Sequence, residues 1–242
     1  ECALASKMGM GTIIVDDGWQ TDDTNRGYAF CGDWRESKNR FPDLKAHVAK
    51  VHAMGMKYML WYSVAWIGDK SAAYERFKGK YLYHTMRTVD SIIEEAEGTR
   101  AIIDSFPEYK GMELHITEFN TSYNPFCPIH DTNYNAALIA GLLSRMGDVC
   151  ASYSYWTFGD VFEEGGVPPR PFHGGFGMIA NQLIPKPTLW TFHFFNNLKG
   201  EPVYRDDNMV LVRRKDGSYQ GIAWNICQEN RDAVTLDVTL PV

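Results

Sequence analysis

Short apolar runs alternate with stretches of helical periodicity along most of this chain. The runs are rich in β-branched and aromatic residues and are bounded by turn residues, which predicts strands over 12–15, 58–62, 114–117 and 151–158. Apolar residues at helical spacing predict helices over 1–8, 42–55, 71–105, 133–146 and 187–198. Strands that alternate with helices form parallel sheets, and continuous apolar strands are typical of sheets covered on both faces. The sequence therefore predicts an α/β protein with buried parallel strands.

The pattern changes near the C-terminus. From Val203 onward apolar residues recur every second position, and Lys215-Asp216-Gly217 is a hairpin turn signal. We expect antiparallel strands there, and hence a barrel-type region over 1–200 followed by a C-terminal β segment over 201–242.

Polar residues follow each predicted parallel strand. A (β/α)8 TIM barrel places its active site at these strand ends, but it needs eight strands, and four are evident. We therefore expect a (β/α)8-type fold that is incomplete within this chain. Its missing side would be exposed or covered by another chain, so a homo-oligomer is expected as one possibility.

Composition excludes several classes of partner. The net charge is −6 with no Lys/Arg cluster, which argues against nucleic acid or an anionic membrane. No apolar run approaches the ~20 residues of a membrane span. Aromatic residues make up 14% of the chain, which favours either sugar-binding surfaces or an aromatic-rich core.

Cysteine usage and the glycine motifs predict no cofactor. The five cysteines are scattered without a C-x-x-C pair, which predicts reduced thiols in a cytoplasmic protein and no zinc site. Gly9-Met10-Gly11 precedes a strand, so it is not a dinucleotide loop. The segment 173–177 predicts a tight glycine loop, with an anion-binding nest as the alternative. The N-terminus shows no secretory signal and reads like the middle of a helix, as in a piece cut from a longer chain.

Glu118 is the strongest single catalytic candidate. It follows the apolar strand 114–117 and precedes Phe119-Asn120-Thr121, so it lies where a strand meets its loop. Position alone leaves two readings open, a catalytic carboxylate or a loop carboxylate held in a salt bridge.

The segment from His115 to Pro125 closely resembles the nucleophile segment of glycoside hydrolase family 39 β-xylosidases. The resemblance extends over about 100–225 and includes the motifs Pro128-Ile129-His130-Asp131-Thr132, Tyr155-Trp156-Thr157-Phe158, Asp160-Val161-Phe162-Glu163-Glu164 and Phe172-His173-Gly174-Gly175-Phe176-Gly177. It implies that Glu118 is the nucleophile of a retaining glycosidase acting on terminal glycosides. It also implies that Trp156, Glu163 and Glu164 line the sugar subsite.

The N-terminal part, about 1–85, is similar to another family, the glycoside hydrolase family 36 α-galactosidases. The matching motifs are Val15-Asp16-Asp17-Gly18-Trp19, Gly32-Asp33-Trp34, Arg40-Phe41-Pro42, Val51-His52, Gly55-Met56-Lys57 and Leu60-Trp61. The resemblance implies that Asp16 and Asp17 bind galactose hydroxyls and that Trp61 lines the pocket. The alternative for the Asp pair is a simple turn. Tyr62-Ser63-Val64 departs from the acidic motif common in that family.

Neither resemblance supplies a complete catalytic pair. The Lys-Trp-Asp segment of the α-galactosidase nucleophile and the Asn-Glu-Pro segment of the family 39 general acid/base both do not occur in the sequence. The pattern resembles a chimera, in which the N-terminal part of one barrel family is joined to the C-terminal part of another, with the junction near 80–100. Asp17, Glu163 and Glu164 are the residues that could replace the acid/base.

Three functions follow as expectations. The first is a glycoside hydrolase of β-xyloside-like specificity, with an oligosaccharide or small glycoside as substrate. The second is α-galactosidase-like activity. The third is a catalytically impaired or non-catalytic sugar-binding fragment or chimera, because losing general acid/base help costs about 10²–10⁴ in rate.

Overall fold

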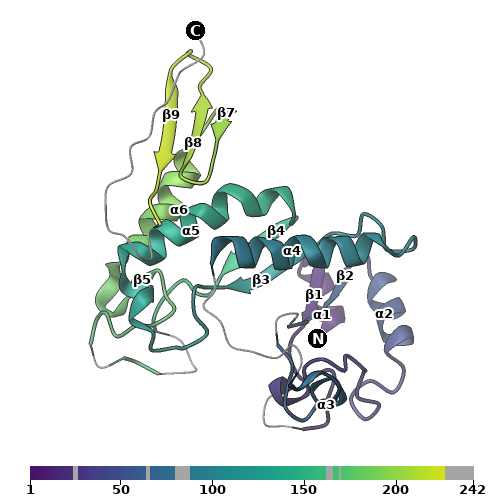
Figure 1. Ribbon diagram of the computed structural model, residues 1–242. Helices are drawn as coiled ribbons and strands as arrows, with labels where there is room; N and C mark the ends of the chain where they lie inside the picture. The colour runs from purple at the N-terminus through teal and green to yellow at the C-terminus, as the bar shows by residue number, and fades with distance from the viewer. Residues whose placement is uncertain (24–26, 64–65, 80–87, 162–165, 169, 227–242) are drawn as a thin grey trace. The chain divides into compact units, whose positions relative to one another are not determined.

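The computed structural model describes residues 1–242 apart from 24–26, 64–65, 80–87, 162–165, 169 and 227–242 (Figure 1). Contacts divide the chain into two compact units, a first unit of Glu1–Thr85 and a second unit of Met86–Val242. Among the described residues, none of the helices combines the length and the apolar character that a membrane span requires.

The first unit is built on two parallel strands, which pair in register from Thr12 opposite Lys57 to Val15 opposite Leu60. Its elements are α1 (Cys2–Lys7), β1 (Thr12–Val15), the 3-10 turn η1 (Gly27–Phe30), α2 (Leu44–His52), β2 (Lys57–Leu60) and α3 (Ala72–Phe77). Short polar side chains start two of the helices. Asp43 accepts a hydrogen bond from the Ala46 amide at 2.8 Å, and Ser71 accepts one from Tyr74 at 3.0 Å.

The expectation that the parallel strands are buried is wrong for β1, β2 and β4 (Ser152–Tyr155), in which no residue is buried. Thr12 and Ile14 are exposed, Ile14 by 54%, while Ile13 and Val15 are half-buried. Along β1, exposed residues alternate with half-buried ones. A continuous apolar run predicts full burial only where both faces are covered, and that condition is not met by the described residues of this unit.

The second unit carries another parallel pair, β3–β4, followed by an antiparallel sheet, β7–β8–β9. Its elements are α4 (Val89–Asp104), β3 (His115–Phe119), η2 (Pro128–Asp131), α5 (Asn133–Arg145), η3 (Met146–Asp148), β4 (Ser152–Tyr155), β5 (Ile179–Ala180), η4 (Asn181–Leu183), β6 (Ile184–Pro185), α6 (Pro187–Asn197), β7 (Glu201–Arg205), β8 (Met209–Arg213) and β9 (Tyr219–Ala223).

Helices α4 and α5 cover β3 and β4 and form the main core with them. The buried residues of this core are Ile92, Ile93, Ala96, Phe119, Leu138, Ile139, Leu142, Met146 and Cys150. A second cluster joins Val210 and Trp224 of the C-terminal sheet to Ala140 of α5. Both helical faces of α5 are therefore used, one toward the strands and one toward the sheet.

The predicted α/β pattern is confirmed in its main elements. The four expected parallel strands form, and the tail from 201 is antiparallel, as the period-two pattern predicts. The described parallel strands form two separate pairs, β1–β2 and β3–β4, and do not close a barrel. The short strands β5 and β6 form a further, antiparallel pair. The apolar positions 234–238 lie outside the described residues, and the division into 1–200 and 201–242 stays a prediction.

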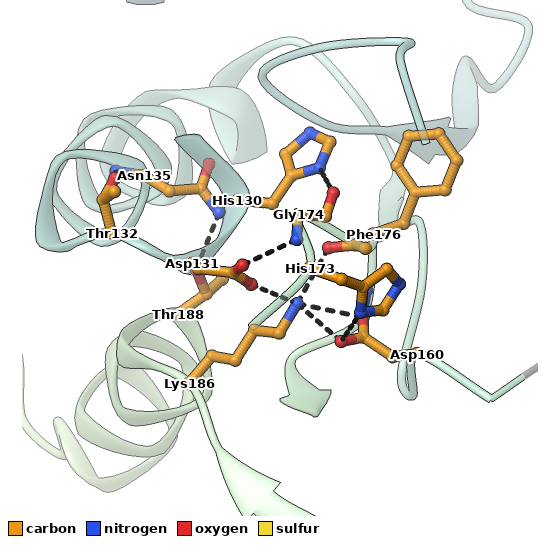
Figure 2. Close-up of polar contacts among 12 residues, drawn as sticks. His130, Asp131, Thr132, Asn135, Asp160, His173, Gly174, Phe176, Lys186 and Thr188 are labelled. Atoms are coloured by element: carbon orange, nitrogen blue, oxygen red, sulfur yellow. Dashed lines mark hydrogen bonds and ion pairs between the residues drawn. The ribbon is translucent and has the colours of Figure 1, made fainter. Parts of the chain in front are cut away.

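A buried ionic cluster connects three segments of the second unit, namely η2, the segment after β4 and the start of α6 (Figure 2). Lys186 directly precedes α6, and its side chain is fully buried. Its Nζ lies 2.6 Å from Asp131 Oδ1 and 2.8 Å from Asp160 Oδ2. We call these three residues the Lys186 cluster. An unpaired buried charge costs several kcal/mol, so the pairing is what allows the ammonium group to lie there.

The glycine-rich segment 173–177 forms a tight loop against this cluster, as predicted. The Gly174 amide donates to Asp131 Oδ2 at 2.7 Å, and the Gly177 amide donates to Asp160 Oδ1 at 2.8 Å. A Cβ atom on Gly177 would lie 2.3 Å from the Asp160 nitrogen, so no side chain fits there. These two amides of the loop therefore bind carboxylates of the chain itself.

His130 lies beside the Lys186 cluster and is fully buried. Its Nδ1 lies 2.8 Å from the Gly174 carbonyl oxygen, and its Nε2 lies 3.2 Å from the carbonyl oxygen of Ser122. Burial lowers the pKa of His130, and this effect outweighs the two carbonyl contacts, which raise it. The shorter contact favours the neutral ring with the proton on Nδ1.

This arrangement predicts a pH-dependent stability. The pKa of His130 is lower in the folded state than the ordinary 6.5, so between these two pKa values the unfolded chain binds this proton more readily than the folded chain. The stability of the fold is therefore greatest above pH 6.5 and decreases as the pH falls from 6.5 through the folded-state pKa of His130. The free energy of unfolding of the second unit should decrease by up to about 1.4 kcal/mol per pH unit in that window. Denaturant titrations at several pH values measure it.

The variant His130→Asn should show a shallower pH dependence than the wild type in this window. His193→Asn, at an exposed position of α6, is the matched control and should keep the wild-type dependence. Equal slopes for the wild type and His130→Asn would contradict the assignment.

Candidate active site

Glu118 is the next-to-last residue of β3, and its side chain is exposed. Phe119, the following residue, is 8% exposed and contacts the rings of Tyr153 and Tyr155 in the core. Successive side chains of a strand point to opposite faces, so burying Phe119 directs Glu118 away from the core. The sequence places Glu118 at the end of a strand, and the structure agrees.

A break in register marks the same part of β3. His115 and Ile116 pair with Ser152 and Tyr153, but Phe119 pairs with Tyr155, so β3 carries one more residue than β4 between these pairs. Such bulges bend a strand and re-aim its side chains. The two residues within the irregularity are Thr117 and Glu118.

Trp156 directly follows β4, the strand that pairs with β3 (Figure 1). Its backbone amide donates to the Phe119 carbonyl oxygen at 3.0 Å, so the two strand ends are joined. The side chain of Trp156 is half-buried, and the peptide bond between Trp156 and Thr157 is cis. An aromatic ring that remains partly open to solvent at such a strand end is suited to contact a sugar face.

Asn120 holds these strand ends in place. Its Nδ2 donates to the carbonyl oxygens of Trp156 at 2.5 Å and of Phe176 at 3.3 Å. Its Oδ1 accepts from the Thr121 amide at 2.8 Å. The carboxamide therefore connects the segment after β3 to the segment after β4 and to the glycine-rich loop.

A buried polar chain continues behind Asn120. Thr121 Oγ1 donates to Asn135 Oδ1 at 2.8 Å, and Asn135 Nδ2 donates to Thr188 Oγ1 at 2.8 Å. Tyr155 also contacts Asn135, with 3.3 Å between its hydroxyl and Nδ2, and burial raises the pKa of Tyr155. The phenol is thus a neutral hydrogen-bonding group at ordinary pH. These contacts fix β3, β4, α5 and α6 relative to one another around the site.

The other expected sugar-binding residues of the second unit, Glu163 and Glu164, lie outside the described residues. Asp160, which precedes them, is buried in the Lys186 cluster and is unavailable to a ligand.

Asp16, Asp17 and Trp61 come together in the first unit. They follow the adjacent parallel strands β1 and β2, and the Trp61 amide donates to the Val15 carbonyl oxygen at 2.9 Å. Asp16 is exposed and Asp17 is half-buried. Asp17 Oδ1 accepts a hydrogen bond from the Gln20 side chain at 2.9 Å, so this carboxylate belongs both to the turn and to the candidate galactose-binding group.

Aromatic rings surround this edge of the first unit. Trp34 has its ring centroid 6.0 Å from that of Trp61, 5.0 Å from that of Tyr62 and 6.2 Å from that of Trp19. The Trp19 indole donates to the Trp61 carbonyl oxygen at 2.8 Å. Among these rings Trp19 is buried and Tyr62 is exposed. The aromatic group therefore contributes one ring to the local core and presents another to solvent.

In the described part of the chain, no group of three or more His, Cys, Asp or Glu side chains could hold a metal ion. The described cysteines Cys2, Cys31, Cys127 and Cys150 are all free thiols. Burial, with a smaller effect of Asp17, raises the pKa of Cys31 to about 11, so this thiol is a poor nucleophile.

Sequence reasoning missed three residues that shape the site, namely Asn120 as a bridge, Asn135 as a buried hub and Lys186 as a buried cation. Asn135 lies within a helix pattern, and Lys186 precedes Pro187 at a helix start, where a surface lysine is ordinary. The polar run after Glu118 was the one available signal for Asn120.

The chain matches the family model "Glycosyl hydrolases family 39" over residues 45–234, more than half of its length. The match begins earlier than the expected 100 and includes part of the segment that resembles α-galactosidases. A β-xylosidase of Geobacillus stearothermophilus is 45% identical over 174 residues, which is 72% of this chain and 34% of that protein.

Two further comparisons bear on the two halves. The structure of a family 39 β-xylosidase from Caulobacter crescentus aligns with a TM-score of 0.58 and 27% identity, over 75% of this chain and 42% of that one. The α-galactosidase Mel36A of Lactobacillus acidophilus is 36% identical over 83 residues, 33% of this chain and 11% of that protein.

These likenesses agree with the expected family 39 resemblance and with the weaker α-galactosidase one. They also agree with a TIM-barrel-like glycosidase fold, of which the described residues form a part. The chain spans about a third of the length of the first curated relative that it matches. On the extent of the family match, the chain belongs to the glycosyl hydrolases of family 39.

Proposed function

We propose that this chain carries the nucleophile side of a retaining glycosidase site for terminal β-xylosides, with Glu118 as the nucleophile. The observation that carries the proposal is the position of Glu118, exposed at a bulge near the end of β3 and joined through Asn120 to Trp156 on the neighbouring strand end. The similarity to β-xylosidases supports the choice of sugar.

The chemistry assigns a role to each group. The Glu118 carboxylate attacks the anomeric carbon, the glycosidic C–O bond breaks, and its electron pair leaves with the aglycone oxygen. Water then hydrolyses the glycosyl ester and releases the sugar. Trp156 supplies a flat apolar surface to the sugar ring, and Glu163 and Glu164 accept hydrogen bonds from its hydroxyl groups.

Protonation of the leaving group requires a second carboxyl about 5–5.5 Å from the nucleophile. The sequence lacks the Asn-Glu-Pro segment that would supply it, so natural glycosides should turn over slowly with this chain. An aglycone that is a stable anion leaves without a proton. Such substrates therefore test Glu118 independently of the acid/base.

Mechanism-based labelling tests the nucleophile directly. The reagent is 2,4-dinitrophenyl 2-deoxy-2-fluoro-β-xyloside. Its 2,4-dinitrophenolate group leaves without being protonated, and the fluorine at C2 slows hydrolysis of the glycosyl ester. We expect one 2-fluoroxylosyl group on Glu118, detected by intact-mass and peptide mass spectrometry. The variant Glu118→Gln should remain unlabelled.

A label on another carboxylate would refute the assignment of Glu118. An unlabelled wild type that still binds xylobiose in calorimetry would favour the alternative, a non-catalytic sugar-binding fragment. The α-galactoside analogue of the reagent serves as the specificity control.

The first unit supports a second candidate function, α-galactoside recognition. The supporting observations are the adjacency of Asp16, Asp17 and Trp61 and the similarity to an α-galactosidase over 83 residues. Its residues would have to meet those of the second unit across a junction that neither family supplies, and errors of about 1 Å cost about 10²-fold in rate.

We therefore expect Glu118→Ala to lower aryl β-xyloside hydrolysis by about 10²-fold or more, and Asp17→Ala to change it only slightly. Aryl β-xyloside and aryl α-galactoside assays on both variants provide the measurement. If Asp17→Ala abolished α-galactoside turnover while Glu118→Ala left it intact, the site would belong to the first unit instead.

We also propose that the (β/α)8-type sheet is incomplete within this chain and that the chain self-associates. Large apolar side chains are exposed on and just before α6, where Leu183 is 84%, Trp190 48% and Phe194 52% exposed, and exposed apolar faces favour association. The mass in solution should rise with concentration in light scattering and sedimentation. A strictly monomeric species at high concentration would contradict this.

A cytoplasmic location remains part of the proposal. It is supported by the four free thiols among the described residues, since disulfides are rare in reducing compartments.

A further inference from the structure

We propose that Lys186 is a positioning residue for Glu118 and Trp156, acting through Asp160 and the loop 173–177. The inference rests on the proposed function, because it concerns the site centred on Glu118. Lys186 touches no substrate in this scheme. Its effect passes through buried contacts that end at the Asn120 carboxamide.

The first step runs from Lys186 to the loop (Figure 2). Lys186 Nζ donates to the Gly175 carbonyl oxygen at 2.8 Å and to Asp160 Oδ1 at 2.9 Å. Asp160 Oδ1 in turn accepts from the Gly177 amide at 2.8 Å. The residues on either side of Phe176 are therefore both held by the Lys186–Asp160 pair.

The second step runs from the loop to the strand ends. The Phe176 carbonyl oxygen accepts from Asn120 Nδ2 at 3.3 Å and from the Thr157 amide at 3.2 Å. Asn120 also donates to Trp156, and it lies two residues after Glu118. A displacement of the Phe176 carbonyl would thus reach both residues of the site.

Close packing makes this coupling stiff. A Cβ on Gly175 would lie 2.4 Å from Asp160 Oδ1, so the loop backbone lies directly against the carboxylate. The Lys186 amide also donates to the Met178 carbonyl oxygen at 2.9 Å, and the Met178 amide donates to Phe158 at 3.0 Å. Little free space remains in which the loop could move without moving Asp160.

Charge explains why the cation is needed. Asp131 and Asp160 have side chains 12% and 0% exposed, and Lys186 Nζ lies between them. Without the ammonium group two buried carboxylates would face each other, and the loop would have to shift to admit water. We therefore expect Lys186→Met to release the Phe176 carbonyl from Asn120.

The test uses the full chain and two readouts. The first is hydrogen exchange of the Asn120 carboxamide protons, followed by ¹⁵N NMR. The second is labelling by the 2-fluoroxyloside, separated into the first-order inactivation rate and the reagent's dissociation constant. Leu142→Ala, a fully buried position in the α5 core, is the control for general loss of stability.

We expect Lys186→Met to lose protection of the Asn120 protons and to lower the inactivation rate by about 10- to 100-fold, with a much smaller change in the dissociation constant. In a double-mutant cycle, Asn120→Ala should add little to Lys186→Met. Leu142→Ala should keep the Asn120 protection. If Lys186→Met does not fold, Asp160→Asn, which keeps the side-chain volume, should show the same changes at smaller amplitude.

Unchanged Asn120 protection in Lys186→Met, or equal loss of protection in Leu142→Ala, would overturn the proposal. So would additive effects of Lys186→Met and Asn120→Ala. An unlabelled wild type would refute the proposed function instead, and the exchange measurement would still decide whether Lys186 controls Asn120.

Discussion

Parallel pairing of β3 with β4 is the constraint on which the candidate site depends. Parallel strands end at the same edge of a sheet, so the residues that follow them meet there whatever their distance in sequence. Glu118 and Trp156 are 38 positions apart and still come from adjacent backbone ends, joined by the Trp156 amide and the Asn120 carboxamide. The helices α4 and α5 stabilise this pair by burying its inner face.

The sequence predicted the structure correctly where a residue pattern is compatible with only one local conformation. Alternating strand and helix patterns predicted the parallel strands, and a polar residue directly after an apolar run predicted where Glu118 lies. The burial of β1, β2 and β4 was predicted wrongly, because an apolar run does not reveal how many neighbours cover it. Ile14 is apolar and yet more than half exposed.

The Lys186 cluster shows a different limit. Its members come from η2, from the segment after β4 and from the start of α6, and each is an ordinary surface residue when its own segment is considered. The cluster exists because tertiary contacts place one cation between two anions, and desolvation then requires that all three remain together. A pattern read along one segment cannot predict such an arrangement. The same holds for Asn135, whose partners lie on β4, on α6 and in the segment after β3.

The alternation of Glu118 and Phe119 has a consequence for how this family can change over time. Because Glu118 and Phe119 occupy opposite faces, shifting the pairing of this end of β3 by one residue would place the carboxylate in the core and the phenyl ring in solvent. Natural selection against an unstable core therefore also preserves the frame in which the carboxylate is presented. Lengths can change in the loops beyond Asn120, whereas Phe119 must keep its register against Tyr155 for the carboxylate before it to stay outside the core.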